Sequence, residues 1–165
     1  MKNQLVESFV TNARKSGADC IVAVTEDGLQ AAIQRVVDHE NLIYCPRQTS
    51  LEQSIVIPKS LETTDVFEAS VAVEEAPWAI AETGSIVCLG ATREQLRTSL
   101  LPEHHVALVK AGNICETFLD FVKNLCELPR NITLITGPSR TADIEKTLVL
   151  GMHGPRCVTV VVIQY

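Results

Sequence analysis

Short apolar runs alternate with amphipathic helical segments along most of this chain. Residues 20–24 form an apolar run, residues 29–37 repeat apolar side chains at helical spacing, and residues 42–45 form the next apolar run before Pro46. A strand, a helix and a second strand joined by short connections form a parallel crossover unit. We therefore predict an α/β fold, a Rossmann-like layered and mainly parallel sheet with flanking helices.

The remaining segments predict further elements of the same layers. A helix should open the chain and end near Gly17, so that residues 1–18 pack over the sheet. Residues 74–80 are expected to form a loop or a single helical turn. Residues 47–64 have the weakest pattern, with 55–57 as a candidate strand. Further strands are expected at residues 68–73, 86–89, 106–109, 132–135 and 158–163, and further helices at residues 92–96, 113–125 and 142–150.

Length and charge limit the classes of function. A chain of 165 residues, 46% of them hydrophobic, suits one domain spanning 1–165. A net charge of −6, with no run of basic residues, disfavours nucleic-acid binding and polybasic membrane attachment. The first 15 residues lack the continuous apolar core of a signal peptide, and no apolar run approaches the ~20 residues of a membrane span. We expect a cytoplasmic protein without a membrane span.

Neither the cysteines nor the histidines are spaced as metal ligands. The chain has six cysteines and no CxxC pair, and most of them lie in or beside apolar runs, where a thiol behaves as a small hydrophobic group. The four histidines lack partners at zinc-site spacing. The sequence therefore predicts no metal site and no cofactor in this chain.

The stretch Asn131–Arg156 contains the clearest candidate binding site. An apolar strand runs into the turn Gly137-Pro138-Ser139-Arg140-Thr141, and a helix that stops at Gly151 is expected to follow. A strand that leads through small residues into a helix start directs backbone N–H groups at one point, which suits an anion. Hydroxyl groups of Ser139 and Thr141 and the guanidinium of Arg140 would add donors. Alternatively, Thr141 or Asp143 only caps the helix.

A second polar turn, Glu82-Thr83-Gly84-Ser85, precedes the strand at 86–89. Gly84, between hydroxylated residues, would allow the backbone to approach a ligand closely. Glu82 is either a helix cap or solvated turn carboxylate, or a carboxylate directed into a cleft. Of the neighbours His104 and His105, one should point inward and the other outward on an extended chain, and one of them would hydrogen-bond to Glu82 or to a bound anion. His153, in the turn Gly151–Pro155, should be partly exposed and close to the turn 137–141.

Three ordered blocks of sequence resemble one known family. They read IAETGSIVCLG at residues 80–90, LLPEHHVALV at residues 100–109, and GPSRTADIE followed by LVLGMHGP at residues 137–155. These blocks are similar to those of the LUD domain, the family of lactate utilization protein C, also called the YkgG family. The resemblance implies an α/β domain similar to the sugar-phosphate isomerase and CoA-transferase-like folds.

The resemblance also implies a pathway. It suggests a subunit that supports oxidation of L-lactate to pyruvate with iron-sulfur partner proteins, the clusters being held by the partners, so that this chain is not necessarily an enzyme by itself. An alternative is a stand-alone protein or enzyme that binds a phosphorylated or carboxylated metabolite or a CoA ester. Since CoA transferases of similar fold use a covalent glutamate, Glu82 is a catalytic candidate. His104 is the second candidate, through a hydrogen bond to Glu82 or to a bound anion. Thr83, Gly84, the turn 137–141, Asp143 and His153 are the anion-binding candidates.

Overall fold

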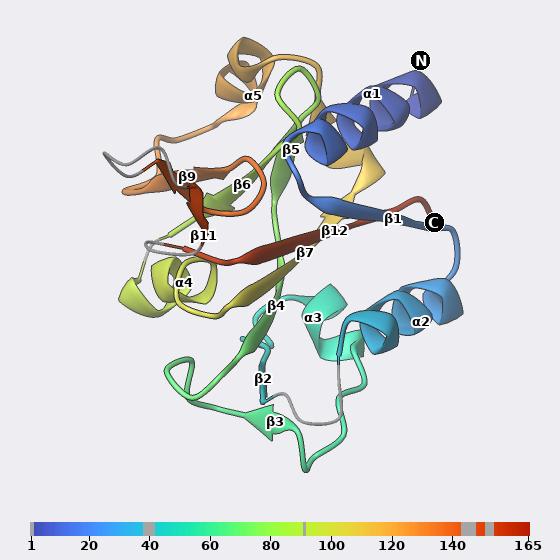
Figure 1. Ribbon diagram of the computed structural model, residues 1–165. Coiled ribbons are helices and arrows are strands. Elements are labelled where there is room, and N and C mark those ends of the chain that lie inside the picture. The colour runs from blue at the N-terminus through green and yellow to red at the C-terminus, as the bar shows by residue number, and fades with distance from the viewer. Residues whose placement is uncertain (1, 38–41, 91, 143–147, 151–153) are drawn as a thin grey trace.

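A six-stranded parallel sheet, here called the main sheet, forms the centre of the computed structural model (Figure 1). The structure describes residues 2–37, 42–90, 92–142, 148–150 and 154–165. The strand order is β1-β12-β7-β4-β2-β3, and every neighbouring pair is parallel. The strands are β1 Asp19–Ala23, β2 Ile43–Tyr44, β3 Glu62–Thr63, β4 Val71–Glu75, β7 His104–Lys110 and β12 Cys157–Ile163. This arrangement confirms the predicted α/β fold.

Four further strands form a smaller second sheet in the order β8-β5-β6-β9. They are β5 Trp78–Ile80, β6 Ser85–Leu89, β8 Ile114–Cys115 and β9 Ile132–Ile135. β6 is antiparallel to both β5 and β9, whereas β5 and β8 run parallel. Only two residues separate β4 from β5, so the chain passes directly from the main sheet into the second sheet.

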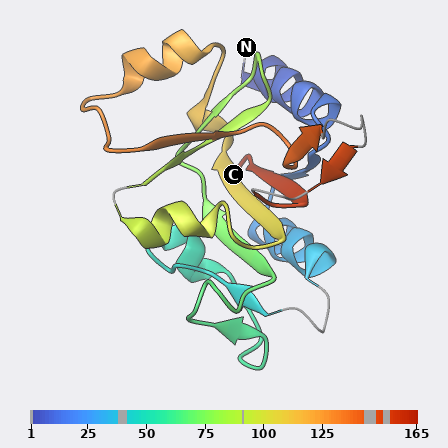
Figure 2. The ribbon, with the colours of Figure 1, turned by 60° about the vertical axis from the view of Figure 1, so that its left-hand side comes forward.

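The two faces of the main sheet are covered differently. Helix α2, Glu26–Val36, packs its apolar side chains with those of β4, β7 and β12 on one face, together with Leu51 of α3, Ser50–Ser54. On the other face, α1, Lys2–Lys15, and strands of the second sheet share a core with the alternate side chains of β7 and β12. Figures 1 and 2 show α1 and α2 on opposite sides of the main sheet.

Two short helices complete the layers. Helix α5, Phe118–Asn124, places buried Phe121 against Ile80 and Val87 of the second sheet. Helix α4, Arg93–Thr98, contacts β4 and β6. The alternation of buried apolar side chains on both faces of β7 and β12 explains why these strands read as continuous apolar runs in the sequence.

The segment after Ser139 differs from the prediction. Instead of a helix, the described residues form an antiparallel hairpin of β10, Arg140–Ala142, and β11, Leu148–Leu150. The short window 142–150 contains apolar residues at both helical and alternating positions, and Val149 in the run Leu148–Leu150 suits a strand. The helix prediction was therefore wrong for Ala142 and for Leu148–Leu150, which lie in strands.

Three other predicted boundaries were also wrong. The expected helix at 113–125 is divided into a 3₁₀ turn at Ala111–Asn113, strand β8, and α5, whose N-cap is Thr117. Glu74, Glu75 and residues 78–80 lie in strands, and not in a loop or a helical turn. Residues 55–57 form no strand; the order in this region comes from α3, where Thr49 and Glu52 form a capping box.

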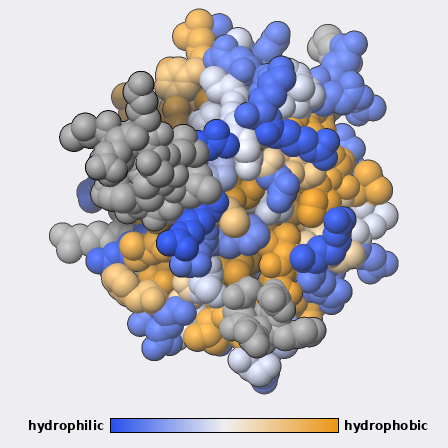
Figure 3. All heavy atoms as spheres, viewed as in Figure 1, coloured by the Kyte–Doolittle hydropathy of each residue, from blue (hydrophilic) through white to orange (hydrophobic). Residues whose placement is uncertain are grey.

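The outer surface mixes polar and apolar side chains. Figure 3 shows polar residues interspersed among apolar ones on the face that it presents. No helix in the described part of the chain has the length and apolar character needed to cross a membrane.

Candidate functional site

The two polar turns predicted from the sequence lie against the C-terminal end of α1. Gly84 has φ of 68°, and a Cβ atom there would come within 2.1 Å of the Ala13 nitrogen. Gly137 has φ of 72°, and a Cβ atom there would come within 2.2 Å of the Ser16 carbonyl oxygen. Glycine is therefore required at both turns for close packing against the helix.

Polar contacts join these turns to each other and to α1. The Ser85 hydroxyl lies 2.7 Å from the Thr83 hydroxyl and 2.6 Å from that of Thr136, which precedes Gly137. The Asn12 amide donates to the carbonyl oxygens of Ala81, at 2.8 Å, and Glu82, at 3.3 Å. The structure thus brings the two predicted turns together, but it places α1 against them.

Arg140 contributes to the same packing. Its Nη2 donates to the Ser16 carbonyl at 3.2 Å, beyond the last residue of α1, where the helix dipole favours a cation. The Ser139 N–H donates to the Pro155 carbonyl at 2.9 Å, so the second Gly/Pro turn lies beside the first, as expected. Pro138 is half-buried next to Gly17. Asp143, His153 and the side chain of Thr141 lie outside the described residues.

Glu82 and His104 are far from forming one site. The Glu82 carboxylate accepts the Phe118 N–H at 2.7 Å at the start of α5, which matches the capping alternative. His104 lies on the opposite face of the main sheet, on the α2 side, where its Nε2 is 2.8 Å from the Thr159 hydroxyl. Burial, with a smaller contribution from His105, lowers the pKa of His104. The predicted hydrogen bond between a histidine and Glu82 is therefore not present.

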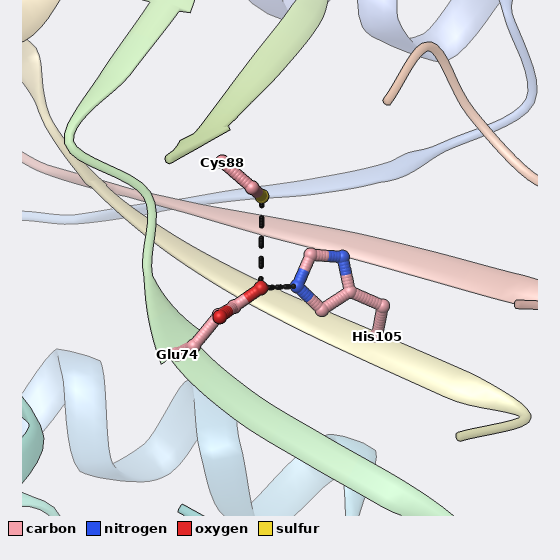
Figure 4. A group of neighbouring side chains, drawn as sticks. All are labelled: Glu74, Cys88 and His105. Carbon is pink, nitrogen blue, oxygen red and sulfur yellow. Dashed lines mark hydrogen bonds and ion pairs between the residues drawn. The ribbon is translucent and has the colours of Figure 1, made fainter. Parts of the chain in front are cut away.

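A different group of polar side chains meets in the interior between the two sheets. Glu74 of β4, Cys88 of β6 and His105 of β7 are all buried. The Glu74 Oε1 atom lies 2.8 Å from His105 Nε2 and 3.6 Å from Cys88 Sγ, so the carboxylate joins the other two groups (Figure 4). We call this group the Glu74–Cys88–His105 cluster.

The register of the strands explains why the cluster forms. β4 and β7 are parallel neighbours with Ala72 opposite His105, and Glu74 lies two residues further along on the same face. A diagonal pair at this spacing is within reach of long side chains. Cys88 reaches the pair from β6 in the sheet that covers this face. His105 thus points into the core while His104 points to the other face, as the alternation of an extended chain predicts.

The cluster is unusual in its electrostatics. Burial and the neighbouring Glu74 carboxylate raise the pKa of the Cys88 thiol well above its ordinary value, so the thiol stays protonated near neutral pH. The side chain of His105 is fully buried, and among the described residues its Nδ1 atom has no hydrogen-bond partner. A buried polar atom without a partner is costly and calls for an explanation.

A pocket of about 280 Å³ reaches the cluster from the surface, with Glu74 and Cys88 in its lining. It lies at the carboxyl ends of β2 and β4, the edge at which open α/β sheets bind ligands. Glu52 and Glu75 also line the pocket. The described residues that line it include no lysine and no arginine. We call it the acidic pocket.

The walls of the acidic pocket are held by specific contacts. The two Glu52 carboxylate oxygens accept N–H groups of Gln48, Thr49 and Glu75 at 2.7–3.1 Å. The Gln95 amide of α4 donates to the Gln48 side chain at 2.8 Å, and Lys110 pairs with Glu75 at 2.8 Å. These contacts fix the loop before α3 against the end of β4.

The sequence reasoning missed this site. The three residues of the cluster are far apart in the chain. Cys88 and His105 lie in two of the three family blocks, but no metal-ligand spacing links them to each other or to Glu74. One signal was present: Glu74 and His105 interrupt apolar runs that become buried strands, and a charged residue in such a strand needs a partner.

Comparison with known proteins identifies the family. A model of the LUD domain matches residues 59–163. The chain belongs to the LUD domain family. This confirms the resemblance carried by the three sequence blocks, and the matched residues of the LUD domain include the whole Glu74–Cys88–His105 cluster.

Relatives of this LUD domain include proteins named lactate utilization protein C. The one from Macrococcus caseolyticus is 34% identical over 114 residues, covering 64% of this chain and 49% of that protein. The one from Exiguobacterium sp. is 26% identical over 186 residues, covering 99% of this chain and 79% of that protein. The chain spans about half or less of the length of several curated relatives that it matches.

The fold of the LUD domain also matches a solved structure. A crystal structure of a DUF162 family protein from Deinococcus radiodurans superimposes with a TM-score of 0.68 at 17% identity, covering 99% of this chain and 98% of that one. At this identity the likeness shows the fold.

Proposed function

We propose that this LUD-domain protein takes part in lactate utilization, as a subunit that supports oxidation of L-lactate to pyruvate together with iron-sulfur partner proteins. The observation that carries the proposal is the family match over residues 59–163, with relatives named for lactate utilization. We further propose that the acidic pocket beside the Glu74–Cys88–His105 cluster is the working site.

The cysteines support placing the iron-sulfur clusters in the partners. An iron-sulfur cluster usually takes about four cysteine ligands. In the described part of the chain, which contains all six cysteines, the group with metal-ligand geometry contains a single one. Burial also raises the pKa of Cys20 and Cys45 to about 11, which makes their thiols unreactive.

Deletion of the gene in its native organism tests the role in lactate utilization. The deletion strain should lose growth on L-lactate as the carbon source but grow normally on pyruvate, and a plasmid-borne copy should restore growth. Normal growth of the deletion strain on L-lactate would overturn the proposal.

A second candidate function follows from the approach of the two Gly/Pro turns beside exposed Arg140. This turn would hold the anionic group of a phosphorylated or carboxylated metabolite or a CoA ester in a stand-alone protein. Thermal melts with phosphate, sugar phosphates, L-lactate, pyruvate and CoA esters test it. A ligand at one hundred times its Kd adds about 2.7 kcal/mol to the free energy of unfolding, which raises Tm. Arg140→Ala should remove most of this rise in Tm. No shift with any of these compounds would reject the second candidate.

A further inference from the structure

The Glu74–Cys88–His105 cluster supplies three kinds of group that bind divalent transition metals: a carboxylate, a thiol and an imidazole. The three ligand atoms lie within 4.8 Å of one another. In a tetrahedral zinc site, bonds of about 2.0–2.3 Å place neighbouring ligand atoms about 3.3–3.8 Å apart. The distance of 3.6 Å between Cys88 Sγ and Glu74 Oε1 already falls in that range, and the contact of 2.8 Å between Glu74 Oε1 and His105 Nε2 needs to open by about 0.5 Å.

We propose that this cluster binds one divalent transition-metal ion of the zinc type through Glu74, Cys88 and His105. Each ligand comes from a strand, two from the main sheet and one from the second sheet, so the ion would join the two sheets. Three protein ligands with one open position is the arrangement of catalytic zinc sites. Because Glu74 and Cys88 line the acidic pocket, the open position faces water or a small oxygen ligand.

Charge supports the assignment. A carboxylate, a thiolate and a neutral imidazole carry two negative charges, which a divalent ion neutralises. This offsets the cost of burying the Glu74 carboxylate, which contacts Cys88 and His105 in the interior. The ion would thereby remove the net negative charge of the cluster, which makes the wall of the acidic pocket less negative than in the metal-free state.

The protons balance as follows. Metal binding releases the Cys88 thiol proton to solvent, because a coordinating thiol is deprotonated. Coordination through Nε2 requires the ring proton of a neutral His105 to be on Nδ1, so a proton on Nε2 would move there with no change in the number of bound protons. One proton is therefore released for each ion bound, and affinity should rise about tenfold per pH unit in the neutral range.

Titration of the chelator-treated full chain with Co²⁺, followed by absorption spectroscopy, tests the site. Cobalt bound by a thiolate in a tetrahedral site gives a sulfur-to-cobalt charge-transfer band and strong visible bands, and added Zn²⁺ should abolish both. We expect one equivalent of Co²⁺ per chain. Absence of a charge-transfer band would overturn the proposal.

Variants assign the ligands. Cys88→Ser should lose the charge-transfer band, whereas Cys20→Ser, a change at another buried thiol of the same core, should keep it. Glu74→Gln keeps the size of the side chain and should weaken Co²⁺ binding about tenfold or more, at least as much as loss of an outer-shell partner does. Circular dichroism checks that each variant is folded. A band that persists in Cys88→Ser would show binding at the exposed thiols of Cys126 and Cys157 and would overturn the proposal.

Discussion

At the scale of single residues, two glycines decide how the chain closes around α1. Gly84 and Gly137 both have positive φ. A Cβ atom at Gly84 would overlap the backbone of Ala13 in α1, and a Cβ atom at Gly137 would overlap the backbone of Ser16. The sequence identified Gly84 as a position of close backbone approach. In the structure, both glycines approach the end of α1.

Replacement of Gly84 by alanine should destabilise the protein by about 2 kcal/mol or more, because the new Cβ is strained at φ of 68° and overlaps the Ala13 backbone. Gly112→Ala is the matched control, since a Cβ there meets nothing within 4 Å, and its effect should stay within about 0.5 kcal/mol. Urea unfolding curves measure both. Equal stability of the two variants would contradict the packing described here.

His104 should make stability depend on pH. Because burial lowers the pKa of folded His104 below the ordinary value of 6.5, the unfolded chain binds more protons than the folded chain when the pH falls through that value. The contribution is fully present above 6.5 and is lost as the pH falls through the lower, folded pKa. Asp19, which favours the protonated form, opposes the shift.

His104→Gln should therefore reduce the loss of stability between about pH 7 and pH 5. Denaturant midpoints measured across this range provide the test, with His104→Gln compared with the unsubstituted chain. An unchanged pH dependence would show that His104 is not the group responsible.

At the scale of elements, α1 packs apolar side chains along its length and makes its polar contacts with the two turns at its C-terminal half. Gly17 and Ala18 N–H groups donate to the carbonyls of Arg14 and Ala13, which ends the helix in a Schellman motif. Arg140 and Asn12 then tie this end to the turns that were predicted to bind an anion.

Asn12→Ala removes two hydrogen bonds to the turn at Ala81 and Glu82 and should cost about 1 kcal/mol. Thr11→Ala, on the exposed side of α1, should change stability by less than about 0.5 kcal/mol. Thermal unfolding followed by circular dichroism compares them. A larger loss from Thr11→Ala would contradict the assigned face of the helix.

Elements with one clear period could be predicted from the sequence. Strand β9 was predicted at Ile132–Ile135, and β1, β7 and β12 were found within two residues of their predicted limits, because β-branched runs bounded by Gly or Pro favour strands. The hairpin of β10 and β11 was not predicted, because the apolar residues in the short window 142–150 fit both the helical and the strand spacing. The division of 113–125 depends on the pairing of β8 with β5, which is a tertiary contact.

At the scale of the whole molecule, the candidate site depends on the stacking of two sheets. The alternation of strands and helices predicted the parallel main sheet, but nothing in the sequence indicated that residues 78–135 would supply a second sheet over it. The Glu74–Cys88–His105 cluster exists only where these sheets meet, and this is why motif spacing did not reveal it.

The most direct test of the account is growth on L-lactate of the deletion strain complemented with Glu74→Gln, with protein levels matched by immunoblot. Glu103→Gln is the control, because the Glu103 side chain is 70% exposed and lies 3.8 Å from Arg156. We predict that Glu103→Gln restores growth and that Glu74→Gln does not. Full growth with Glu74→Gln would contradict the claim that the acidic pocket beside Glu74 is the working site.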